Sequence, residues 1–179
     1  MTIDYASKCR IFIEKNNIIA QHRVFDERVH TAQAAADLLG VGVDEIVKNR
    51  PDDGMAVLEA RKRARFLCVK TVVLKVGGKF IACILKGGDK VDLGKVRTLR
   101  GTGDVRVAKP DEVLEATGYP VGGVPPFGHG LEVYIDEAVI ALSTVHAGGG
   151  SDHALVTLRT KELVRTTGAI IVRLVMRNA

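Results

Sequence analysis

Two glycine-rich stretches hold the residues of this chain that are best suited to chemistry. Residues 117–130 read TGYPVGGVPPFGHG, with five glycines and three prolines in fourteen positions, and residues 145–153 read VHAGGGSDH. Glycine lets the main chain approach a ligand closely and lets successive N–H groups point the same way, so such loops can bind an oxyanion without any side chain. Each stretch alone is equally consistent with a long turn, since glycine-rich connections are common.

The common catalytic and cofactor motifs are absent from the sequence. It has no Gly-x-Ser-x-Gly, no Gly-x-x-x-x-Gly-Lys-Ser/Thr, no His-Glu-x-x-His and no Cys-x-x-Cys, so neither an NTPase nor a metalloenzyme is expected, and no cofactor is predicted. The dispersed histidines favour structural hydrogen bonding over metal binding; they are His22, His30, His129, His146 and His153. Three widely spaced cysteines among apolar neighbours predict buried thiols without disulfides: Cys9, Cys68 and Cys83.

Composition limits the class of protein. With 179 residues, 46% of them hydrophobic, the chain is expected to form a single domain spanning 1–179. It has neither an apolar run of membrane-spanning length nor a signal-peptide pattern, so a cytoplasmic location without membrane contact is expected. The formal charge of +5 is compatible with an anionic partner but does not identify one.

Local patterns predict helices and strands in alternation, hence a mixed α/β fold. Capped amphipathic patterns predict helices at 3–15, 31–40, 92–99, 110–118 and 160–168, and Leu93, Val96 and Leu99 are expected on one apolar helix face. Strands are predicted at 71–76, 79–85, 131–136, 143–147, 153–159 and 169–175, the last of them buried. The first two form a β-hairpin, because only Gly77 and Gly78 separate them.

A basic segment interrupts this pattern. Residues 50–70 hold six basic and three acidic residues, so a net charge of +3 of the chain's +5 lies there, with RKRAR at its centre. A helix lying against phosphates and a solvated helix or loop both fit the composition, and charge runs more often simply face water.

Several motifs, in their order along the chain, carry a resemblance to a known family. TAQAAADLLGV, VKTVVLKVGGKFIACILKG, VDLGKV, ATGYPVGGVPPFGH and ELVRTTGA together resemble the YbaK/ProRS-associated family of aminoacyl-tRNA deacylases. The resemblance implies a compact α/β domain with a curved, barrel-like mixed sheet flanked by helices. It also implies hydrolysis of the ester of a mischarged aminoacyl-tRNA, supplied in trans to a synthetase and without a cofactor. An aminoacyl ester is already activated, so positioning and oxyanion stabilisation suffice.

The resemblance assigns roles to individual residues. The family's functional lysine falls on Lys70, where an ammonium group would contact the substrate carbonyl or the terminal phosphate. The N–H groups of the Ala147, Gly148 and Gly149 turn are the expected oxyanion donors, with Lys70, Gly148 and Gly149 as the catalytic set. The remaining substrate-contacting candidates are Thr31, Gly122, Gly123, Pro125, Phe127, Ala147 and His153; helix capping alone also explains Thr31, and a structural role is favoured for His129 and His153.

The chain departs from the family pattern at residues 49–69, the basic insertion, which adjoins the lysine position. Lys48 and Lys70 both remain candidates, and Lys70 is preferred because Thr71 and the strand follow it. The insertion is an arm for tRNA, a tolerated loop or an obstruction of the site. A non-catalytic module that binds aminoacyl-adenosine, a nucleotide or a tRNA 3′ end is the alternative function, and a nonspecific RNA-binding protein is a weaker one. The amino acid removed is open among alanine, cysteine and serine, as is the oligomeric state.

Overall fold

The computed structural model describes residues 3–29, 32–39 and 68–175. Thr31, Lys48 and the basic insertion up to residue 67 therefore lie outside the described residues. No described helix is long and apolar enough to cross a membrane.

Fourteen elements follow one another along the described chain, and most lie where the sequence patterns predict them. The helices are α1 (Tyr5–Lys15), α2 (Ala32–Leu39), α5 (Leu93–Arg100), α6 (Pro110–Thr117), α7 (Glu137–Ile140) and α8 (Thr160–Thr167). The strands are β1 (Ala20–Val24), β2 (Val69–Val76), β3 (Lys79–Lys86), β4 (Val105–Val107), β5 (Glu132–Asp136), β6 (Thr144–Gly148), β7 (Ala154–Arg159) and β8 (Ile170–Val172).

Capping and turn residues fix several of these boundaries. The Asp92 carboxylate accepts hydrogen bonds from the N–H groups of Gly94 and Lys95 and so begins α5. Gly118 and Gly168 adopt left-handed conformations and end α6 and α8. The turn between β2 and β3 consists of Gly77 and Gly78, both with positive φ, as a two-residue hairpin turn requires.

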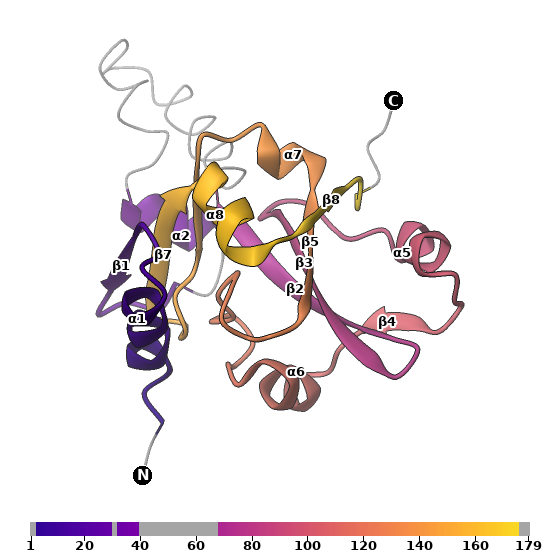
Figure 1. Cartoon of the computed structure of the whole chain (residues 1–179). Helices are drawn as coiled ribbons and strands as arrows, with labels where there is room; N and C mark the ends of the chain where they lie inside the picture. The colour runs from indigo at the N-terminus through magenta and orange to yellow at the C-terminus, as the bar shows by residue number, and fades with distance from the viewer. Residues whose placement is uncertain (1–2, 30–31, 40–67, 176–179) are drawn as a thin grey trace.

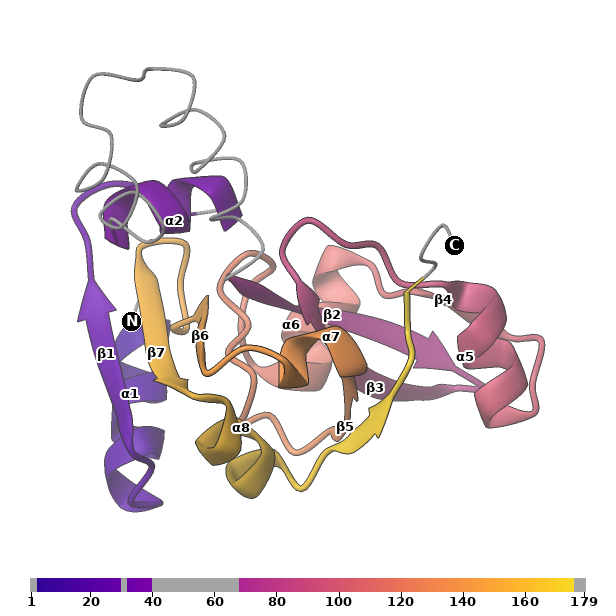
Figure 2. The same ribbon diagram turned by 90° about the horizontal axis from the view of Figure 1, so that it is seen from above.

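The strands form two sheets that meet at one point. Five strands pair in the order β4-β2-β3-β5-β8, with parallel pairing of β5 to β3 and to β8, and three strands pair in the order β1-β7-β6. An isolated parallel bridge between Cys68 and His146 joins the start of β2 to β6. The three-stranded sheet lies on one side of the molecule, and β4 with α5 lies on the other (Figures 1 and 2). The result is the expected mixed α/β architecture, in which helices flank the mixed five-stranded sheet.

Helices cover both faces of this sheet. One core packs side chains of α1, α6 and α8 against β2, β3, β5 and β7, with Ile13, Val113 and Leu163 among them. A second core packs Val96 of α5 and Leu174 against the opposite face of β2, β3 and β5. A third, smaller core joins α2 to the three-stranded sheet through Ala35, Cys68 and Leu155.

Two burial predictions are wrong. Leu99 is 43% exposed, so it does not share the buried face of α5 with Val96. The last predicted strand is shorter than expected, and Ile170 and Ile171 are nearly half exposed because β8 is an edge strand of the five-stranded sheet. Only Leu174 and Val175 of that segment are buried.

Candidate functional site

A cavity of about 440 Å³ opens where β2 and β6 separate after their single bridge. It lies within the range of small-molecule sites. Its lining consists largely of apolar side chains together with main chain from β2, β6 and the glycine-rich loop. The lining residues include Val29, Ala35, Cys68, Lys70, Thr71, Val121, Gly122, Val124, His146, Ala147, Gly148 and Leu155.

The main chain of Thr71 faces this cavity. The N–H of Gly87 donates to the carbonyl of Cys68 at 2.7 Å, which fixes the alternation of the β2–β3 ladder. In an antiparallel ladder every second residue turns its N–H and C=O away from the partner strand, so Thr71 and Val73 turn theirs away from β3. The N–H of Ala108 donates to the carbonyl of Val73 at 2.9 Å on that outer edge, as this alternation requires.

On the opposite wall, Gly148 presents its main chain. The N–H of Gly149 donates to the carbonyl of Ala154 at 2.8 Å, so Gly149 and Ala147 direct their N–H groups towards β7. Gly148 lies between them and turns its N–H towards β2 and the cavity. Of the three predicted oxyanion donors, Gly148 is the one that turns its N–H towards the cavity, because Ala147 and Gly149 direct theirs towards β7.

The two glycine-rich stretches contact each other directly. The N–H of Gly150 donates to the carbonyl of Gly123 at 2.8 Å. A Cβ on Gly123 would lie 2.6 Å from the Cα of Ser151, and one on Gly148 would lie 2.7 Å from the carbonyl oxygen of Val124. Glycine at these positions therefore permits the close packing of the two loops. Gly122, which lines the cavity, has a φ of +89° and open space around it.

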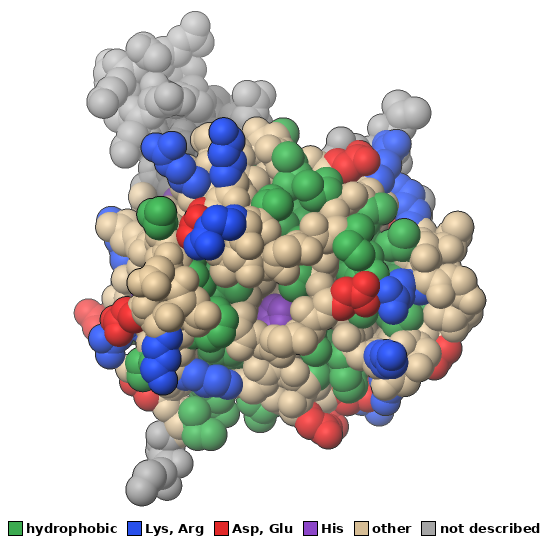
Figure 3. Space-filling model, in the orientation of Figure 1, with side chains coloured by type: hydrophobic (Ala, Val, Ile, Leu, Met, Phe, Trp, Pro, Cys, Tyr) green, Lys and Arg blue, Asp and Glu red, His purple; other side chains and the backbone are tan. Residues whose placement is uncertain are grey.

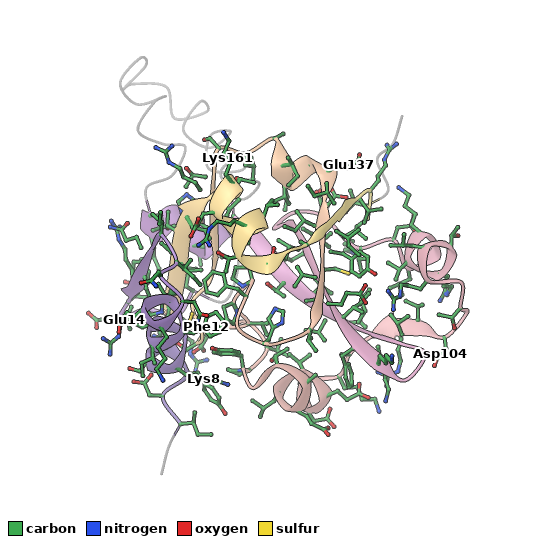
Figure 4. The ribbon with its side chains drawn as sticks, viewed as in Figure 1. Lys8, Phe12, Glu14, Asp104, Glu137 and Lys161 are labelled. Atoms are coloured by element: carbon green, nitrogen blue, oxygen red, sulfur yellow. The ribbon has the colours of Figure 1, made fainter. Side chains whose placement is uncertain are left out.

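The prolyl and aromatic part of the first loop anchors it to the core. Pro125 and Phe127 are buried and do not line the cavity. The Phe127 ring stacks on the ring of Phe12 at a centroid distance of 6.0 Å. Figure 4 shows Phe12 reaching from α1 towards the middle of the molecule. These residues support the loop that carries Gly122 and Val124, and the structure gives them no contact with the cavity.

His153 lies apart from the cavity. The N–H of Phe25 donates to the main-chain carbonyl of His153 at 2.7 Å. The Nδ1 of His153 lies 3.3 Å from the carbonyl oxygen of Phe25. These contacts tie the end of β1 to the turn before β7. His153 is thus held at the end of β1 and does not line the cavity.

Lys70 is the one charged side chain among the described residues that line the cavity. It is half-buried, and its Nζ donates to the carbonyl of Gly87 at 3.1 Å. Burial lowers the pKa of Lys70, while the nearby Asp89 carboxylate raises it and Lys90 lowers it further. A partly desolvated ammonium group at a cavity wall acts more strongly on a developing negative charge than one in water.

His146 also lines the cavity, a position that the sequence analysis missed. Its Nδ1 lies 2.9 Å from the Thr157 hydroxyl. Burial lowers its pKa, and the positive charge of Arg23 lowers it further, so the neutral imidazole is favoured. His146 precedes Gly148 by two positions, and residues two apart in a strand lie on the same face and the same edge. This spacing could have placed His146 beside the predicted oxyanion donor.

His129, at the end of the first loop, is expected to make stability depend on pH. Its Nε2 is buried without a hydrogen-bond partner among the described residues, and burial lowers its pKa to about 4. Because the unfolded chain binds this proton near pH 6.5, the stability gained from a neutral His129 is complete above that pH and is lost as pH falls towards 4. We expect a loss of about 3 kcal/mol from this residue.

Urea unfolding between pH 7 and pH 4 measures this effect, with His129→Gln as the variant that cannot titrate. The variant is expected to lose stability less steeply with falling pH than the wild type. Parallel pH profiles for the two proteins would show that His129 is not the group responsible.

Charge is dispersed on one face of the molecule (Figure 3). On the face shown in Figure 3, basic and acidic side chains are interspersed around the periphery and form no single large patch. Among residues 3–29, 32–39 and 68–175, no cluster of histidine, cysteine, aspartate and glutamate is arranged to hold a metal ion.

Comparisons with known proteins agree with this architecture. Residues 53–166 match the aminoacyl-tRNA editing domain family. The chain is 31% identical over 141 residues to the uncharacterised protein YwhH of Bacillus subtilis, covering 78% of this chain and 76% of that protein. It is 26% identical over 157 residues to proline–tRNA ligase of Staphylococcus aureus, covering 83% of this chain but only 24% of the ligase.

Solved structures show the same fold. A crystal structure described as that of a proposed trans-editing enzyme for prolyl-tRNA synthetase superposes with a TM-score of 0.79 and 28% identity, over 99% of this chain and 100% of that one. The family match extends from the basic segment to α8 and includes Lys70, Gly122 and Gly148. The chain therefore belongs to the aminoacyl-tRNA editing domain family.

Proposed function

We propose that this protein hydrolyses the ester bond of a mischarged aminoacyl-tRNA, as a trans-editing deacylase. The observation that carries the proposal is the cavity between β2 and β6, which brings Lys70 and the N–H of Gly148 to one small, mainly apolar space. The amino acid and the terminal ribose would occupy this space, with the rest of the tRNA outside it.

The chemistry follows from the groups that are present. A water molecule adds to the ester carbonyl carbon, and the Gly148 N–H stabilises the oxyanion that forms. The carbon–oxygen bond to the ribose then breaks, the ribose oxygen takes a proton, and the free amino acid and tRNA leave. The attacking water would be oriented by a main-chain carbonyl or by the neighbouring ribose hydroxyl, so no nucleophilic side chain is required.

Lys70 has two possible contacts in this scheme. Its ammonium group would lie near the substrate carbonyl or near the phosphate of the terminal adenosine, and it favours negative charge in either place. The partners implied are the aminoacylated 3′ end of tRNA and, through the relatives, prolyl-tRNA synthetase.

Deacylation of a panel of labelled aminoacyl-tRNAs tests the proposal. The panel comprises alanyl-, cysteinyl-, seryl- and prolyl-tRNA, and the wild-type protein is expected to release one of the first three much faster than proline. The cavity of about 440 Å³ would have to hold the terminal ribose as well as the amino acid, which is the reason to expect a small side chain. Release of none of them, with binding of tRNA retained, would contradict hydrolysis and support the non-catalytic binding module.

A further inference from the structure

The cavity edge of β2 has one residue whose main chain has no partner strand among the described residues. On this edge β6 forms a β-bridge with the start of β2 only at Cys68, and β4 pairs from Leu74 onward. The Val73 carbonyl accepts from the N–H of Ala108. Thr71 lies between these contacts and lines the cavity. An N–H and a C=O that face a cavity and pair with no neighbouring strand are free to pair with a bound ligand.

The side chain of Thr71 gives a second sign of an incomplete site. Its Oγ1 is buried and has no hydrogen-bond partner within the described part of the chain. A buried hydroxyl without a partner is costly, and such groups are few in native proteins. Thr71 thus combines an unpaired hydroxyl with an unpaired strand edge.

An aminoacyl ester carries the groups that this edge requires. Like any residue of a strand, it has one amino nitrogen and one carbonyl on the two sides of a single Cα. In a hydrogen-bonded antiparallel pair, two residues exchange both of their N–H···O bonds. A single extended aminoacyl group can therefore make the same two bonds to one residue of a strand edge. This is β-strand addition by a ligand of one residue.

The charge of the cavity supports this mode of binding. Among its described lining residues there is no carboxylate to receive a substrate amino group, and the one charged side chain is the cation Lys70. A main-chain carbonyl on the cavity edge is then the natural acceptor. The N–H of Gly148, on the opposite wall, remains available for the second lone pair of the ester oxygen.

We propose that the aminoacyl group binds as a one-residue β-strand on Thr71, its amino group donating to the Thr71 carbonyl and its ester carbonyl accepting from the Thr71 N–H. The inference rests on the proposed function and adds to it a subsite for the free α-amino group and a second oxyanion donor. It makes the enzyme selective for α-aminoacyl esters over simple acyl esters.

Binding of two stable analogues tests the amino-group subsite without any turnover. The probes are the alanyl and propionyl amides of 3′-amino-3′-deoxyadenosine, which differ only in the amino group, and affinity is measured by calorimetry. The wild type is expected to bind the alanyl amide about 10-fold more tightly or better, the value of one hydrogen bond to a charged donor. Equal affinities would overturn the inference.

A pair of variants tests the N–H. Thr71→Pro removes this N–H, and proline is tolerated on a strand edge where the N–H makes no ladder bond. We expect it to lower kcat/KM for the best substrate of the panel by about 100-fold, as for an oxyanion donor. Thr71→Val is the matched comparison, because it removes the hydroxyl and keeps the N–H, and its loss is expected to be much smaller.

The outcomes separate this inference from the function on which it rests. If Thr71→Pro has a wild-type unfolding transition and is as active as Thr71→Val, the N–H has no role and the inference fails while deacylation stands. If the wild type cleaves no aminoacyl-tRNA but still prefers the alanyl amide, the proposed hydrolysis fails and the subsite stands. If Thr71→Pro does not fold, the two amides on the wild type still decide the question.

Discussion

Replacing Lys70 by alanine is expected to lower kcat/KM for deacylation by about 100- to 1,000-fold, the usual cost of removing a group that stabilises charge in the transition state. The side chain lies at the cavity wall and is partly shielded from water, so its charge would act strongly on an ester or phosphate bound there. Single-turnover deacylation of the best aminoacyl-tRNA substrate measures the effect.

Lys79→Ala provides the control for loss of a lysine. Lys79 is exposed at the β2–β3 turn, pairs with Val76 and does not line the cavity, so its removal should leave the rate unchanged. Activity of Lys70→Ala at the level of Lys79→Ala would contradict the role of Lys70. It would leave Lys48, which lies outside the described residues, as the candidate.

The pH dependence of the wild type gives a second test of Lys70. Burial lowers the pKa of this ammonium group below its ordinary value of 10.5. If the charged form is the active one, the rate should fall on the alkaline side at a pH below 10.5, and Lys70→Arg, which stays charged, should lack this fall. A rate that is flat up to pH 10.5 would show that the charge of Lys70 is not needed.

Local patterns predicted most of the fold because they act over short distances. The hairpin of β2 and β3 needs only two apolar strands and the Gly77–Gly78 turn, and α5 needs only the Asp92 cap. The short strands β1 and β4 were not predicted, since β1 is largely exposed and β4 has three residues. Their pairing depends on neighbours far away in the sequence. The exposure of Ile170 likewise depends on the position of β8 at the sheet edge, which no local pattern reveals.

The candidate site was predictable only in part, for the same reason. The resemblance placed Lys70, Gly122, Ala147 and Gly148 in one pocket, and all four line the cavity. It did not reveal which N–H groups are free, because that depends on the register of β6 against β7. Thr71 was overlooked because its unpaired edge exists only where β6 diverges from β2, and the two strands lie far apart in the sequence.

Gly148→Ala is expected to destabilise the fold at the cavity wall. The added Cβ would lie 2.7 Å from the Val124 carbonyl oxygen and 3.1 Å from that of Gly123, so β6 and the first loop must move apart. The opposing atoms are main chain, which cannot rotate away as a flexible side chain can. We expect a loss of about 1 to 3 kcal/mol in the free energy of unfolding, as for other overpacked sites.

Gly148→Ala is expected to lower activity as well as stability. Its N–H is the proposed oxyanion donor, and a displacement of about 1 Å in a catalytic group costs about 100-fold in rate. Gly103→Ala is the matched control, because a Cβ there meets nothing within 4 Å and the backbone is not left-handed. Urea unfolding and single-turnover deacylation of the three proteins measure both quantities. A folded Gly148→Ala with wild-type kcat/KM would show that the reaction does not depend on the close packing of the two loops at Gly148.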